Sequence, residues 1–103
     1  MNYSILWTCE ARRDAQEIVS WVKSVFGNKA AEEVYENISS GTELLSYMPF
    51  SGITYASNSH YRVLRFKLSS IYYRINNDTI VITGVFDNRR DNRRIATILS
   101  QRK

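Results

Sequence analysis

Three closely spaced runs of β-branched and aromatic residues constrain the fold of this chain more than any other feature. Their sequences are YRVLRFK at 61–67, IYYRI at 71–75 and TIVITGVF at 79–86. Runs of this composition that are bounded by polar residues predict strands. Asn76, Asn77 and Asp78 separate the last two runs, and these residue types tolerate a positive φ, so a tight hairpin is predicted there. The second half of the chain is therefore expected to form a small, mainly antiparallel sheet.

Two amphipathic helices are predicted ahead of this sheet. Thr8 is placed to cap the first helix, Gly27 to end it in a left-handed conformation, and Asn28 to cap the second. Gly41 in the second helix lets a neighbouring element approach closely. Apolar residues at spacings of three and four predict the buried face of each helix, so the residues of these faces, with Gly27, are expected to be structural. The two faces comprise Ala11, Ala15, Ile18, Val19, Val22, Val25 and Phe26, and then Ala31, Val34, Tyr35, Ile38 and Leu45.

The remaining segments complete one α+β domain that spans residues 1–103. The opening MNYSILW predicts a strand, and MPFSGITYASNS at 48–59 predicts a surface loop because Pro, Gly, Ser and Asn are frequent in it. The closing NRRIATILSQRK predicts a short amphipathic helix with Ile95, Ile98 and Leu99 on one face. The predicted order is β-α-α-β-β-β-α, with the helical hairpin packed on one face of the sheet and a short C-terminal helix.

Charge is divided unevenly along the chain. Residues 1–47 contain seven acids and four bases, whereas residues 48–103 contain ten bases and three acids. No carboxylate occurs between Glu43 and Asp78. Such asymmetry is typical of a surface that binds nucleic acid or an acidic partner chain.

Several classes of protein do not fit this sequence. No apolar run is long enough to span a membrane, and the N-terminal segment lacks the pattern of a signal peptide, so a cytoplasmic protein is expected. Cys9 is the only cysteine and His60 the only histidine. The sequence therefore predicts no disulfide within the chain, no metal site and no cofactor.

Three segments carry a resemblance to a known family. They are EARRDAQEIVSWV, LLSYMPFSG and the long block YRVLRFKLSSIYYRINNDTIVITGVFDNRRD. In them the chain resembles the RelE/ParE superfamily, the toxins of bacterial type II toxin–antitoxin modules. The resemblance implies growth inhibition, roles in plasmid stabilisation and bacterial stress response, and neutralisation by a cognate acidic antitoxin. It also implies a homodimer or a toxin–antitoxin hetero-oligomer.

The superfamily contains two activities. RelE-like members resemble ribonucleases that cut messenger RNA on the ribosome, and they need cations and a proton-transfer group. ParE-like members lack that set and bind DNA gyrase. This chain has Asp87 where many ribonucleases have a histidine, Ser69 and Ser70 where an arginine is frequent, and Ile95 and Leu99 where a catalytic tyrosine is frequent. These departures favour the ParE-like branch.

Two alternatives stay open. The first is a metal-independent endoribonuclease that acts on ribosome-bound messenger RNA, with Arg65, Lys67 and Arg89 stabilising the phosphate and His60 or a tyrosine moving the proton. The second is an inactive remnant that still binds its antitoxin.

Residues of the basic half are the candidates for contact with the antitoxin or the target. Strict alternation puts Arg65 and Lys67 on one face of the sheet and Arg62 on the other, so only part of the set is expected to converge. Tyr72 and Tyr73 also alternate, and one of them is expected to be exposed for stacking. Asp91 and one neighbouring arginine are expected to be structural, because partly buried charges require pairing. The binding candidates are Arg62, Arg65, Lys67, Tyr72, Arg74, Arg89, Arg90 and Arg93.

Overall fold

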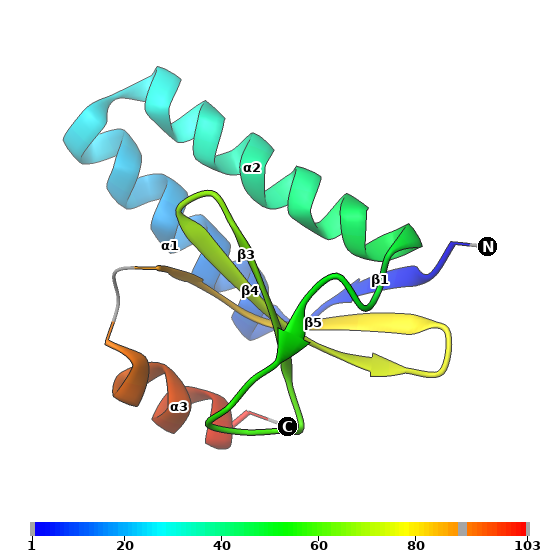
Figure 1. Ribbon diagram of the computed structural model, residues 1–103. Helices are drawn as coiled ribbons and strands as arrows, with labels where there is room; N and C mark the ends of the chain where they lie inside the picture. Colours follow the sequence, from blue (N-terminus) through cyan, green and yellow to red (C-terminus); the bar gives the residue numbers. More distant parts are fainter. Residues whose placement is uncertain (1, 89–90, 103) are drawn as a thin grey trace.

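A five-stranded sheet and three helices form the chain, as the computed structural model shows for residues 2–88 and 91–102 (Figure 1). The α+β class and the predicted order of elements are confirmed. One short strand, β2, is additional, and it lies inside the segment predicted to be a loop. In chain order the elements are β1 (Ser4–Trp7), α1 (Cys9–Phe26), α2 (Asn28–Tyr47), β2 (Ile53–Thr54), β3 (Arg62–Phe66), β4 (Ser69–Asn76), β5 (Thr79–Asp87) and α3 (Asn92–Ser100).

The strands lie in the order β1-β5-β4-β3-β2. β1 is parallel to β5, with Ser4 opposite Thr79, and the other three pairs are antiparallel. The predicted tight turn between β4 and β5 is present, with Asn77 at φ 57°. Lys67 has φ 60° and lies in the turn after β3, outside the strand in which the sequence placed it. The sheet is thus antiparallel except at the β1 edge.

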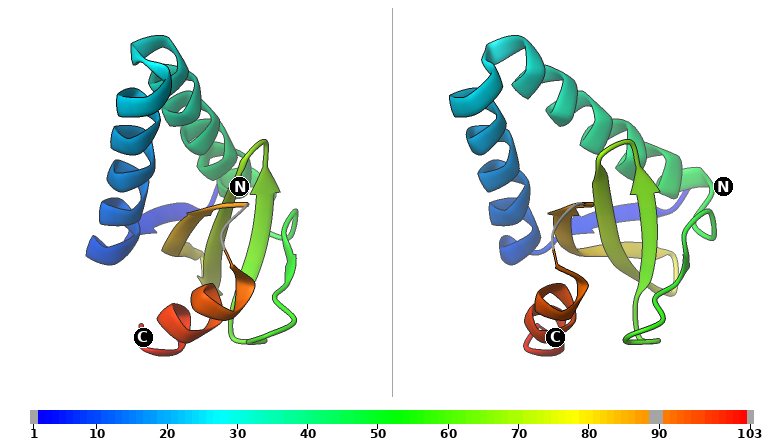
Figure 2. Two further views of the ribbon diagram at one scale, coloured as in Figure 1. Left: turned by 90° about the vertical axis from the view of Figure 1, so that its left-hand side faces the viewer. Right: turned by 60° about the vertical axis from the view of Figure 1, so that its left-hand side comes forward.

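Both faces of the sheet are covered (Figure 2). Helices α1 and α2 cover one face over a core that includes Leu45, Ile71 and Ile82, and α3 covers part of the other face. Gly41 meets the sheet as predicted, because a Cβ added there would lie 2.7 Å from Ile71 Cδ1. The second core, under α3, contains Ile95 and Leu99 among its residues.

The prediction that one tyrosine of the Tyr72–Tyr73 pair is exposed is wrong. Tyr73 lies in the core under α1 and α2, and Tyr72 lies in the core under α3; both are at most 1 % exposed. The two tyrosines do point to opposite faces of the sheet, as predicted, although the pairing of β4 with β5 is irregular between them. Burial, reinforced by the nearby Tyr55, raises the pKa of the Tyr72 hydroxyl. Tyr72 therefore has no surface to offer a partner.

The helical hairpin departs from the prediction near its turn. Thr8 caps α1 by accepting a hydrogen bond from the Ala11 N–H, as predicted. Gly27 ends α1 at φ 95° and ψ 177°, a region essentially restricted to glycine, and itself takes the N-cap position of α2 that was predicted for Asn28. Val22 is buried and Ile18 packs against the core.

The last turn of the predicted apolar face of α1 does not reach the core. Val25 is 53 % and Phe26 62 % exposed, and Tyr35 of α2 is also exposed, so their predicted burial is wrong. The reason is visible in both views of Figure 2, where the turn of the hairpin projects beyond the strands. The periodicity of the helix continues, but no sheet lies beneath it.

Candidate functional site

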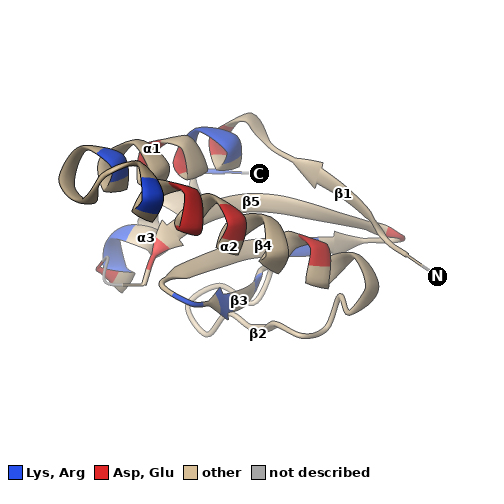
Figure 3. Ribbon diagram, turned by 90° about the horizontal axis from the view of Figure 1, so that it is seen from above, with Lys and Arg blue, Asp and Glu red and all other residues tan. Residues whose placement is uncertain are grey.

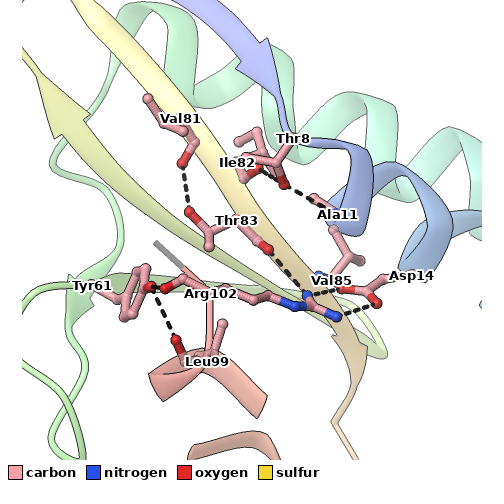
Figure 4. Close-up of polar contacts among 10 residues, drawn as sticks. All are labelled: Thr8, Ala11, Asp14, Tyr61, Val81, Ile82, Thr83, Val85, Leu99 and Arg102. Atoms are coloured by element: carbon pink, nitrogen blue, oxygen red, sulfur yellow. Dashed lines mark hydrogen bonds and ion pairs between the residues drawn. The ribbon is translucent and has the colours of Figure 1, made fainter.

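A buried ion pair joins α1 to the segment after α3 (Figure 4). Arg102 Nη1 lies 2.6 Å from Asp14 Oδ2, and Nη2 lies 3.1 Å from Oδ1, which makes the contact bidentate. Arg102 also donates to the Thr83 carbonyl, and Asp14 accepts from the Val85 N–H. The Asp14 and Arg102 side chains are only 8 % and 17 % exposed. We name this pair, with its two contacts on β5, the Asp14–Arg102 clamp.

The clamp fixes the position of α3 against the sheet. The Tyr61 hydroxyl lies 2.7 Å from the Arg102 carbonyl oxygen and 3.2 Å from that of Leu99, so the residue just before β3 holds the same segment as well. The hydrogen bonds to Asp14 raise the pKa of the Arg102 guanidinium. Sequence reasoning missed this pair, because Asp14 was not among the residues predicted for the buried face of α1. The signal was present, because Asp14 follows Ala11 by three positions and precedes Ile18 by four, on the buried face.

Asp91 is the N-cap of α3, where its Oδ1 accepts a hydrogen bond from the Arg93 N–H at 2.9 Å. Arg93 Nε lies 3.9 Å from the same carboxylate, and both side chains are well exposed. Asp91 thus has a structural role as the cap of α3, although it is exposed and the burial argument does not apply to it. Arg89 and Arg90 lie outside the described residues.

The predicted basic residues separate into two groups. Figure 3 shows acidic residues along α1 and α2, together with some basic ones, and basic residues on β3 and α3. Arg65, Lys67 and Arg93 are exposed, with Arg65 on the face of the sheet that α3 covers in part. We name these three residues the outer cations. Arg62 and Arg74 are half-buried at the opposite end of β3.

Arg62 and Arg74 line one polar hollow of about 460 Å³. β4 continues past the start of β3, because Arg62 pairs with Tyr73 and no β3 residue remains opposite Arg74. Because side chains alternate along a strand, Arg62 and Arg74 leave opposite faces of the sheet. At this end of the strands both nevertheless line the same hollow. The hollow is also lined by Phe50, Thr54, Ser59, His60, Ile75 and Asn76. We name it the β3-end pocket.

In the ribonuclease alternative, His60 lies far from one of the proposed cations, Lys67. His60 and Lys67 flank β3 at its two ends, roughly 20 Å apart for a strand of this length. Ser69 and Ser70 are buried, and Ile95 and Leu99 point into the core under α3. A cation and a proton carrier must lie within hydrogen-bond reach of the same reacting group, which this arrangement of His60 and Lys67 does not provide.

A groove of about 550 Å³ runs between α1 and α2. The surface that lines it is largely apolar, with contributions from Trp7, Val19 and Ile38, and it also includes Arg12 and Lys23 of α1. Such a groove fits the apolar face of an amphipathic helix with acidic residues on its flank.

Metal binding and membrane insertion find no support in the part of the chain that the structure describes. No three histidine, cysteine, aspartate or glutamate side chains gather there in a way that would hold a metal ion. None of the helices combines the length and apolar character needed to cross a membrane.

Comparisons with known proteins identify the family. A family model described as the ParE toxin of the type II toxin–antitoxin system parDE matches residues 5–92. Similar folds occur in a chain of the chromosomal ParDE system from P. aeruginosa, with a TM-score of 0.72, 19 % identity, and coverage of 82 % of this chain and 95 % of that chain. They also occur in a chain of the RelBE2 toxin–antitoxin complex from Mycobacterium tuberculosis, with a TM-score of 0.64, 20 % identity, and coverage of 84 % and 99 %. No curated protein sequence matches the chain.

The two solved structures share the fold of this chain at low identity and include both branches of the predicted superfamily, so they do not choose between a ParE-like and a RelE-like activity. The family model is more specific, and it extends from β1 to the first residue of α3. The chain belongs to the ParE toxin family of type II toxin–antitoxin systems.

Proposed function

We propose that this chain inhibits bacterial growth by binding DNA gyrase in the cytoplasm, without catalysing a reaction, and that a cognate acidic antitoxin neutralises it. The match of residues 5–92 to the ParE family carries the proposal. The separation of His60 from Lys67 along β3 supports it, because a binding inhibitor needs no assembled proton-transfer site.

The proposed gyrase contact is the side of the molecule formed by α3 and the outer cations. Arg93 is 95 % exposed at its side chain, and the cap at Asp91 and the Asp14–Arg102 clamp hold the helix that carries it. An arginine on a rigid element is a frequent anchor of protein interfaces. Arg89 is a further proposed anchor from the sequence.

The first test separates gyrase inhibition from messenger cleavage. Purified protein is expected to inhibit DNA supercoiling by gyrase and to leave ribosome-bound messenger RNA intact; in cells, DNA-damage signalling and filamentation should precede any fall in protein synthesis. Arg93→Ala is expected to weaken inhibition about tenfold or more, as for an interface anchor. Arg13→Ala, which removes an exposed arginine of α1, is the control and should inhibit normally.

Two outcomes would contradict the proposal. Cleavage of messenger at the decoding site that is lost in Arg65→Ala or His60→Ala would move the chain to the ribonuclease activity. A folded protein that binds its antitoxin but inhibits neither gyrase nor translation would be an inactive remnant.

The proposed antitoxin site combines the α1–α2 groove with the outer cations. An acidic, partly disordered segment folds on binding. One part of it fills the groove with apolar side chains, and another part places carboxylates beside the outer cations. Ionic contacts of this kind make the affinity dependent on salt.

Removal of two outer cations is expected to weaken antitoxin binding. Arg65→Ser with Lys67→Ser should raise the dissociation constant about tenfold at low salt and flatten its rise with salt, because fewer ion pairs remain to be screened. The matched control, Arg13→Ser with Lys29→Ser, makes the same change of charge at exposed positions of α1 and α2. Equal losses in both double variants would show that only net charge matters and would refute the proposed contact.

A further inference from the structure

We propose that the β3-end pocket binds a nucleotide, with Arg62 and Arg74 holding its phosphate group and the ring of Phe50 stacking on its base. The proposal concerns a different part of the molecule from the gyrase contact and does not rest on it.

The positive charge of the pocket is complementary to a doubly charged anion. Two guanidinium groups line it, and none of its lining residues is a carboxylate. The Nε atoms of Arg62 and Arg74 are both buried and have no hydrogen-bond partner. Buried charged donors left without partners are unfavourable, and a phosphate monoester, with a charge close to −2, matches two guanidiniums.

The two arginines are held in different ways, and both leave donors available. Arg62 Nη2 donates to the Gly52 carbonyl at 2.6 Å, and its guanidinium carbon lies 5.1 Å from the centre of the Phe50 ring. These contacts orient Arg62. Arg74 makes no hydrogen bond or ion pair with any residue that the structure describes, although it lies at the rim of a sheet whose other buried polar groups are largely paired. Arg74 therefore has its full set of donors for a ligand.

Further donors surround the arginines. Thr54, Ser59, His60 and Asn76, whose side chains can donate hydrogen bonds, line the same space. A carboxylate has two oxygens, which one arginine satisfies in a bidentate contact, whereas a terminal phosphate has three and is suited to donors that converge from several directions. The number of donors therefore favours phosphate over the carboxylate of an acidic peptide.

The aromatic side chain favours a nucleotide over free phosphate. Phe50 lines the pocket and is 66 % exposed, so its ring is accessible to a ligand. Stacking of a base on such a ring contributes about 1–3 kcal/mol. The volume of about 460 Å³ falls within the range of small-molecule pockets.

The test measures binding to the complete protein by nuclear magnetic resonance and calorimetry with four probes: inorganic phosphate, ribose 5-phosphate, adenosine 5′-monophosphate and adenosine. We expect saturable binding of the three phosphates, strongest for the nucleotide, and none of adenosine at the same concentrations. Amide signals of Thr54, Ser59, His60 and Asn76 should shift on binding, while those of α3 remain in place. This mapping uses the unmodified chain and so does not depend on any variant folding.

Two variants assign the contacts. Arg74→Gln is expected to weaken binding of every phosphate about tenfold or more, because it removes one of the two cations. Phe50→Leu should lower the affinity for the nucleotide towards that for ribose 5-phosphate and leave inorganic phosphate unaffected. Arg93→Gln is the control, with the same change of charge at an exposed arginine outside the pocket, and should bind normally.

The proposal is overturned if no phosphate probe binds saturably, or if Arg93→Gln weakens binding as much as Arg74→Gln. It is also overturned if an acidic peptide shifts the signals of the pocket while all three phosphates leave them unchanged. That result would make the pocket a carboxylate site. Each readout is independent of gyrase inhibition, so failure here and failure of the proposed function are distinguishable.

Discussion

Replacement of Asp14 by alanine is expected to lower the free energy of unfolding by about 3–5 kcal/mol, because it leaves the guanidinium of Arg102 buried without its counter-charge. The Val85 N–H loses its acceptor in the same change. For a domain of this size such a loss corresponds to a fall in melting temperature of roughly 15–30 °C. Thermal and denaturant unfolding, followed by circular dichroism, measure it.

A double variant separates the charge from the packing. Asp14→Leu with Arg102→Met removes both charges and keeps apolar volume, and it should recover most of the stability, because paired buried charges contribute little beyond an apolar equivalent. Asp91→Ala is the control at an exposed carboxylate that caps α3, with an expected loss of about 1 kcal/mol. Equal losses for Asp14→Ala and Asp91→Ala would show that the clamp does not stabilise the fold.

Replacement of Gly52 by alanine is expected to destabilise the protein by about 2–4 kcal/mol. A Cβ at this position would lie 2.6 Å from the Tyr73 hydroxyl oxygen and 2.8 Å from the Val63 carbonyl oxygen of β3. Neither neighbour moves easily, because Tyr73 is fully buried and its hydroxyl donates to the Pro49 carbonyl and accepts from the Gly52 N–H. Calorimetric melting of the variant measures the loss.

The same clash predicts that the effects of Gly52→Ala and Tyr73→Phe on the free energy of unfolding are not additive. Tyr73→Phe removes the oxygen nearest to the added methyl group, so the combined variant should be more stable than the sum of the two single losses implies. The closeness of Val63 remains, and the combined variant should still melt below Tyr73→Phe alone. Strict additivity would contradict the geometry described for this turn.

The fold was largely predictable because each element carries a local signal. The β-branched runs, the polar turn at Asn77 and the caps at Thr8 and Gly27 act over a few residues, and the structure has all of them. The burial of Tyr72 was not predictable in this way. It depends on α3 and on Tyr55 closing over a face of the sheet that strand alternation alone leaves open.

The residues of the sites depend still more on contacts between distant segments. Asp14 and Arg102 are brought together by the whole sheet, and α1 shows only that Asp14 lies on its inner face. Arg62 and Arg74 meet because β4 is longer than β3, a difference of length that the two sequence runs do not reveal. The exposure of Phe26 likewise follows from where the sheet ends and not from the periodicity of α1.

The pairing of β1 with β5 sets an order of events during synthesis on the ribosome. Ser4 pairs with Thr79, and Asp14 pairs with Arg102. The first strand and the first helix therefore leave the exit tunnel long before the residues that they contact have been synthesised. Throughout that interval α1 and α2 are present without the sheet that covers their inner faces. The apolar residues of these faces, such as Ala11, Ile38 and Leu45, therefore stay exposed until the residues of β5 have been synthesised.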